Sequence, residues 1–162
     1  MNISVLVAVS VFLAIACWTD LRTMHISNKL VLLFACSGLL YQMLSYGALH
    51  GIEFALMGAL AGFVPLYLLF LLRGLGGGDV KWFGAFGMWT GVLPTLQLMI
   101  YSLLCAGGIA LFVLFFRLPW LRELAMRVKW PWGSHPTTSG RAAHFPFMLA
   151  VAPSFMILIA KG

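Results

Sequence analysis

Apolar runs separated by short polar breaks follow one another along the whole chain. Several of these runs approach the roughly 20 residues that a helix needs to cross a bilayer. The runs cover residues 3–18, 30–46, 54–72, 80–93, 94–116 and 145–160. We therefore predict an all-α, polytopic membrane protein with about six transmembrane helices, in which residues 1–162 form a single membrane-embedded domain.

The fourth run, residues 80–93, is the shortest of the series. At about 1.5 Å per residue it falls short of a hydrocarbon core of roughly 30 Å. Either it extends further at one end or the bilayer is thinner there. Gly84, Gly87 and Gly91 recur along it, and this spacing predicts close packing against a neighbouring helix. Pro94 fits the first turn of the helix that follows.

Composition supports the membrane class. The chain is 62% hydrophobic and 9% charged, with a mean hydropathy of +1.01. Soluble domains are about 45–50% apolar and about 25% charged, so a sizeable soluble domain is excluded. Cys17, Cys36 and Cys105 form no CxxC pair, and neither a zinc ribbon nor a disulfide framework is indicated. We expect neither a metal nor a cofactor.

The basic residues are unevenly distributed. The net charge is +6, and nine of the ten Lys and Arg residues fall in the breaks 19–29, 73–81 and 117–143. We favour cytoplasmic loops over nucleic-acid binding, because positive charge collects on the cytoplasmic side of membrane proteins. Six crossings keep all three breaks on that side and leave the N-terminus outside. No Lys or Arg precedes the first run, which is therefore not typical of a signal peptide.

The largest polar segment, residues 117–141, begins with an amphipathic pattern. Leu118, Leu121 and Leu124 follow helical spacing, and tryptophans lie close by. This pattern predicts a cytoplasmic amphipathic segment in the headgroup region. A helix that binds a specific partner is the alternative.

Candidate chemistry lies in the two aspartates of the chain, Asp20 and Asp79. Each stands at the predicted cytoplasmic end of an apolar run. Two carboxyls that share a site do not both ionise easily, so one holds a proton while the other stays charged. Such a dyad can hydrolyse an amide bond. The alternative is that each aspartate merely ends a helix in interfacial water.

The neighbours of the aspartates favour the dyad. Gly76, Gly77 and Gly78 precede Asp79 in a predicted turn, where the absence of side chains suits an extended substrate. Lys81 follows Asp79 by two residues, and Arg22 follows Asp20 in the same way. These two cations would favour ionised carboxyls or bind lipid phosphates.

Three motifs resemble those of the type IV prepilin peptidases. GGGDVK resembles their GxGD motif with a following lysine, and DLRTMHISN resembles their first aspartate motif, which ends here at Asn28. HFPFMLAVAP, with Pro146 and Pro153, is similar to their final helix. The resemblance implies that Asp20 and Asp79 are the catalytic pair. The surrounding candidates for substrate binding are Gly76, Gly77, Gly78, Lys81, Arg22 and Asn28.

The resemblance also implies an aspartic endopeptidase of the bacterial inner membrane that removes the basic leader of prepilin or pseudopilin precursors at the cytoplasmic face. Without the paired CxxC motifs of the long enzymes, the chain is closer to the short form that serves Flp-type, tight-adherence pili. Ser27 stands where a proline is common. An archaeal preflagellin peptidase is a related alternative.

A different class of function is a non-enzymatic assembly subunit or a proton-coupled transporter that uses Asp20 and Asp79. Both aspartates lie at the ends of apolar runs, and no inverted repeat is evident. Transporters typically carry such groups near the membrane midplane, so we favour the peptidase.

The charge asymmetry generates a topology prediction. After replacement of the native cysteines, a cysteine introduced within residues 134–139 should be shielded from a membrane-impermeant thiol reagent in intact cells. A cysteine at Gly47 should react, because that break carries no basic residue. External labelling of the 134–139 region would contradict the six-crossing layout.

Overall fold

The computed structural model describes residues 2–23, 27–72, 74–115 and 147–161 of the protein. These residues form six helices and no strand, which confirms the predicted all-α fold. The helices are α1 (Ile3–Thr23), α2 (Asn28–Tyr46), α3 (Ala48–Leu71), α4 (Gly77–Thr90), α5 (Val92–Phe115) and α7 (Met148–Lys161). The helices α1, α2, α3 and α5 are long and apolar enough to cross a membrane, whereas α4 and α7 have 14 residues each. The protein is a multi-pass membrane protein.

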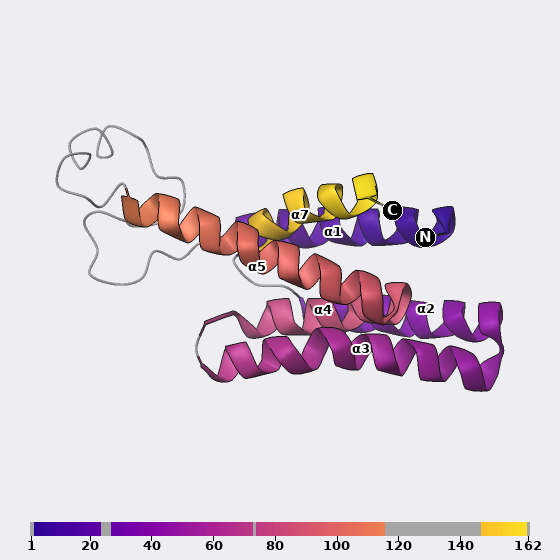
Figure 1. Ribbon diagram of the computed structural model, residues 1–162. Helices are drawn as coiled ribbons and strands as arrows, with labels where there is room; N and C mark the ends of the chain where they lie inside the picture. Colours follow the sequence, from indigo (N-terminus) through magenta and orange to yellow (C-terminus); the bar gives the residue numbers. More distant parts are fainter. Residues whose placement is uncertain (1, 24–26, 73, 116–146, 162) are drawn as a thin grey trace.

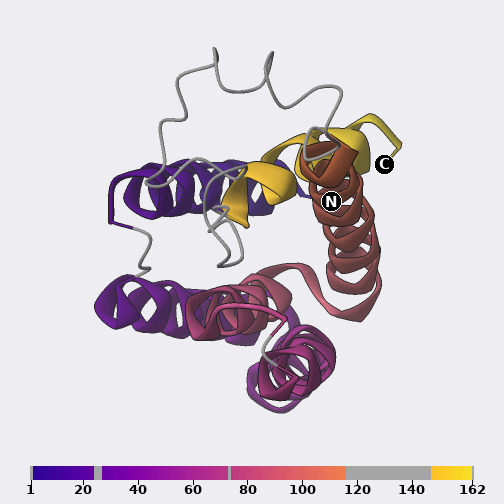
Figure 2. The ribbon, with the colours of Figure 1, turned by 90° about the vertical axis from the view of Figure 1, so that its left-hand side faces the viewer.

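Successive helices run in opposite directions through the bundle. Figure 1 shows that α1, α3 and α5 finish at the left, where α2, α4 and α7 begin. Five charged residues belong to these helix ends: Asp20, Asp79, Arg22, Lys29 and Lys81. We call this side of the molecule the charged end of the bundle. Seen from that end, α1 and α7 form one layer, α2, α4 and α3 form the other, and α5 lies along one edge (Figure 2).

The core lies between the two layers and is centred on α4. Trp82, Phe83 and Phe86 of α4 are fully buried. The Trp82 ring stacks on Phe12 of α1 at a centroid distance of 5.3 Å, and Phe12 in turn stacks on Phe34 of α2 at 3.7 Å. Stacked aromatic rings therefore connect the two layers through the side chains of α1, α2 and α4.

Glycines let α3 and α4 approach to backbone contact. A Cβ on Gly58 would collide with the carbonyl oxygen of Gly87, and a Cβ on Gly87 with that of Gly58. This confirms the predicted packing role for Gly87. Gly84 is not required in the same way, because its Cβ would lie at an ordinary 3.6 Å from Phe63. Gly91 also packs closely against α3, because a Cβ there would collide with the Phe54 ring, and it adopts a positive φ of 80° in the turn before α5.

The far end of α4 is capped from α2. A helix leaves its last carbonyls without intrahelical partners, and lipid offers none. The Gln42 side-chain Nε2 donates to the carbonyl oxygens of Met88 (3.3 Å) and Trp89 (2.7 Å). The Trp89 ring nitrogen donates to the Phe34 carbonyl oxygen at 2.9 Å. These bonds allow a short helix to end inside the bundle.

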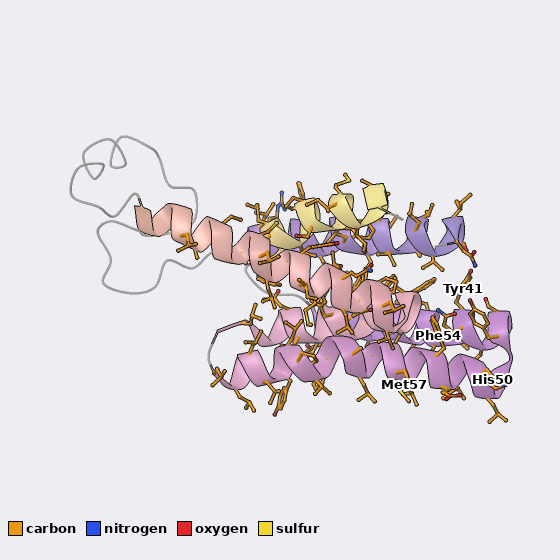
Figure 3. All side chains as sticks on the ribbon, viewed as in Figure 1. Tyr41, His50, Phe54 and Met57 are labelled. Carbon is orange, nitrogen blue, oxygen red and sulfur yellow. The ribbon has the colours of Figure 1, made fainter. Side chains whose placement is uncertain are left out.

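Beyond α4, the hairpin of α2 and α3 continues to the opposite end of the molecule. Tyr41 of α2 faces the start of α1 there, and its hydroxyl lies 2.8 Å from the Ser4 hydroxyl (Figure 3). His50 and Met57 lie on the outer side of α3 in the same view. The junction of α4 and α5 lies short of this end, as Figure 1 shows.

Three helix boundaries differ from those expected. The predicted polar loop beginning at Asp20 is wrong in its first residues, because α1 continues to Thr23. The break expected between the apolar runs 30–46 and 54–72 shrinks to Gly47, whose φ of 85° suits glycine alone. The glycine turn ends at Gly76, and α4 begins at Gly77, so Gly78 is helical. Helices extend until an alternative conformation is stabilised, and polar residues alone do not stop them. The amphipathic segment predicted within 117–141 lies outside the described residues.

The capping of α4 generates a stability prediction. Gln42→Leu keeps the apolar bulk but leaves two buried carbonyls without a donor, which should lower the free energy of unfolding by about 1–2 kcal/mol. The measurement is the thermal unfolding midpoint in detergent. Gln97→Leu is the matched control, because Gln97 is exposed on α5. Equal effects of the two changes would contradict the capping role.

Candidate active site

Asp20 lies in the last two turns of α1 and is only 7% exposed. Its Oδ2 accepts a hydrogen bond of 3.3 Å from the backbone N–H of Met148, the first residue of α7. The free N–H groups and the dipole of a helix N-terminus stabilise negative charge. Cys17, one turn earlier on α1, lies 3.5 Å from the Met148 carbonyl oxygen. The start of α7 therefore holds the end of α1 and orients the Asp20 carboxyl.

Asp79 lies in the first turn of α4 and is 8% exposed. Its carboxyl accepts a hydrogen bond from the backbone N–H of Gly76, the N-cap residue. Asp79 is the third residue of α4. In a capping box, the side chain at this position accepts a hydrogen bond from the backbone N–H of the N-cap residue in the same way. A Cβ on Gly76 would lie 3.1 Å from Asp79 Oδ2. Glycine at this position keeps the space beside the carboxyl open.

The packing of α1 against α4 brings the two carboxyls into one electrostatic environment. Burial, and then the negative charge of Asp20, raise the pKa of Asp79 to about 7, against a smaller lowering effect of the Gly76 hydrogen bond. Asp79 belongs to α4, which is not one of the four helices that are long enough to span a membrane. At neutral pH the Asp79 carboxyl is thus held close to its point of half-ionisation, beside a second carboxyl.

The other predicted site residues divide into two groups. Lys81 and Asn28 are brought together, with Lys81 Nζ donating to Asn28 Oδ1 at 3.1 Å. Arg22 is exposed and covers the Trp18 ring at 4.8 Å, a cation–π contact. Lys81 follows Asp79 by two residues, which places it about 200° further around the axis of α4.

The glycines before Asp79 also have separate surroundings. A Cβ on Gly77 would lie 3.4 Å from the Phe70 ring of α3. Gly78 is helical, and the positive-φ glycines of the described chain are Gly47 and Gly91. Gly78 therefore does not adopt a left-handed backbone conformation that favours glycine. The close approach of an extended substrate to these glycines stays a prediction.

Sequence reasoning missed the backbone amide of Met148 and the indole of Trp82. A backbone donor leaves no residue-type signal, although its position at the start of an apolar run was visible. Trp82 is fully buried one turn after Asp79, and its Nε1 has no hydrogen-bond partner among the residues that the structure describes. No group of three or more His, Cys, Asp or Glu residues that could hold a metal occurs in the described ranges.

A comparison with protein families gives the classification. The family model described as the type IV leader peptidase family matches residues 7–113, about two thirds of the chain. The chain belongs to the type IV leader peptidase family. No match was found among curated proteins or among solved structures.

Membership of the type IV leader peptidase family confirms the resemblance seen in the motifs. In general terms the protein is therefore a peptidase that processes prepilin-like substrates. The matched region of the family includes Asp20, Asp79 and Lys81, whereas α7 lies beyond it. The contact of Met148 with Asp20 thus joins the family region to the last described helix.

The raised pKa of Asp79 generates a pH prediction. Because the folded-state pKa lies above the ordinary 3.8, protonated Asp79 stabilises the fold at low pH, and this stabilisation is lost as the pH rises through about 7. Asp79→Asn removes the titration and keeps an acceptor for the Gly76 amide. The unfolding midpoint of the variant in detergent, measured relative to that of the wild type, should therefore be several degrees higher at pH 8 than at pH 5. A difference that does not change with pH would contradict the prediction.

Proposed function

We propose that the protein is an aspartic endopeptidase that removes the leader peptide of type IV prepilin or pseudopilin precursors, with Asp20 and Asp79 as its catalytic pair. The observation that carries the proposal is the burial of these two carboxyls at the same end of the bundle, on helices α1 and α4 that pack against each other. They are the only aspartates in the chain. Two carboxyls that share a proton are the arrangement that aspartic proteases use.

The surroundings of the two carboxyls support different roles. The Met148 amide at the start of α7 stabilises a charged Asp20, which acts as general base and takes a proton from water. The protonated Asp79 donates its proton to the carbonyl oxygen of the scissile peptide while the water oxygen attacks the carbonyl carbon. As the tetrahedral intermediate collapses, the C–N bond breaks and the proton held by Asp20 goes to the leaving amine. A hydroxyl of the intermediate returns its proton to Asp79 as the new carboxyl group forms, which restores the starting state of the pair.

The membrane supplies the orientation of the substrate. A prepilin has a basic leader followed by an apolar helix, so the bilayer can hold the helix while the leader junction lies at headgroup level. The charged end of the bundle, with Asp20 and Asp79, would lie at the same depth on the cytoplasmic face of a bacterial inner membrane. Binding in this orientation replaces much of the positioning that a soluble protease obtains from a cleft.

The short-form, Flp-type assignment is a finer part of the proposal. Arg22 and the glycines 76–78 stay candidates for substrate binding. Asn28 and Lys81, also predicted to bind substrate, instead bond to each other on the side of α4 away from Asp79.

The catalytic roles are tested by isosteric amides. Asp20→Asn and Asp79→Asn should each reduce processing at least about a hundredfold, because an amide cannot exchange the proton that acid–base catalysis needs. The measurement is the ratio of mature to precursor protein after coexpression with a Flp-type prepilin.

Glu53→Gln is the matched control, since Glu53 is an exposed acid near the opposite end of the bundle, 3.8 Å from His50. It should leave processing unchanged. An unfolding midpoint at or above that of the wild type in the two asparagine variants separates lost catalysis from lost structure. Full processing by either variant would rule out the dyad.

A further inference from the structure

An apolar groove lies on the side of the bundle where α2 and α3 flank α4. Its volume is about 460 Å³, and Gly84 and Ala85 of α4 form part of its lining. Leu32 of α2 and Leu60 of α3 also line it, and they are 66% and 54% exposed. Since α2 and α3 are long enough to span a membrane, this exposed apolar groove is presented to lipid.

Gly84 contributes to the depth of the groove without being required by packing. Gly87 and Gly58 permit backbone contact between α3 and α4, whereas a Cβ on Gly84 would make only ordinary contact with Phe63, at 3.6 Å. Glycine inside a helix is less favourable than alanine by roughly 1 kcal/mol. A glycine kept here leaves space beside Ala85 that helix packing does not use.

The groove has one polar end. Asn28, the first residue of α2, and Lys81, near the start of α4, line it and hydrogen-bond to each other. Asn28 is neutral, and no acidic residue lines the groove, so the Lys81 ammonium charge has no counter-charge in this lining. Both residues belong to the charged end, where headgroups lie. The groove thus combines an apolar length with a cation at its headgroup end.

The groove does not suit the peptidase substrate. Lys81 lies about 200° around α4 from Asp79, so the groove and the carboxyl pair occupy opposite sides of that helix. The basic leader of a prepilin would also be repelled by the Lys81 charge. An anionic headgroup with an attached apolar chain complements both parts of the groove.

We propose that the groove binds an anionic phospholipid, with one acyl chain along Gly84 and Ala85 and the phosphate at Lys81. Lipid at this position contacts α2, α3 and α4 together and stabilises the start of α4. The site is separate from the carboxyl pair, and its test does not depend on peptidase activity.

Native mass spectrometry of the full chain in detergent tests the proposal, with phosphatidylglycerol and phosphatidylcholine of identical acyl chains as probes. The wild type should prefer phosphatidylglycerol about fivefold, the factor expected for one lysine–headgroup contact. Lys81→Gln should abolish this preference. Lys29→Gln should retain it, because Lys29 is exposed at the same end of α2 but does not line the groove.

Filling the groove tests the acyl-chain contact. Gly84→Leu, and independently Ala35→Leu from the α2 wall, should reduce binding of both lipids at least fivefold while circular dichroism and gel filtration stay as in the wild type. Because the two substitutions lie on different helices, the test remains decisive if one of the two variants does not fold.

Three outcomes would overturn the proposal. These are equal binding of both lipids by the wild type, unchanged lipid binding by the folded filled variants, and displacement of phosphatidylglycerol by inorganic phosphate alone. Displacement by a peptide with the apolar helix of a prepilin would also overturn it and would assign the groove to substrate.

Discussion

The backbone contact between α3 and α4 at Gly58 and Gly87 is the constraint on which the rest of the structure depends. It holds a helix of 14 residues deep among longer ones, where lipid provides no hydrogen-bond partner for exposed backbone. The far end of α4 is therefore capped by a side chain, since Gln42 donates to the Trp89 carbonyl oxygen. With α4 placed in this way, its aromatic side chains connect the two layers of the bundle.

Burial of two carboxyls at one end of the bundle is unfavourable unless their charge is reduced or stabilised. Two backbone amides contribute, that of Met148 to Asp20 and that of Gly76 to Asp79. The proton that Asp79 retains near neutral pH removes much of the remaining repulsion. The same proton is what an aspartic peptidase donates, so the electrostatic requirement of the fold and the chemical requirement of the proposed reaction coincide.

The two sides of α4 have different environments because helical residues two apart face in nearly opposite directions. Asp79 interacts with α1, whereas Lys81 bonds to Asn28 on α2 beside the groove. The glycines also have different roles: Gly87 permits contact between helices, Gly91 permits both a turn and close contact with Phe54 of α3, and Gly84 leaves space. One short helix thus joins the proposed catalytic pair to a surface that faces lipid.

The sequence by itself determined the all-α membrane class and the position of Asp20 and Asp79 at helix ends, because hydropathy and charge act locally along the chain. Only the tertiary structure decided that the Met148 amide holds Asp20, that Lys81 lies away from Asp79, and which glycine packs against α3. Membrane helices are apolar on all sides, since lipid and protein interior are similarly apolar. Hydrophobic periodicity therefore does not reveal which faces meet, and this information arises only when the helices pack.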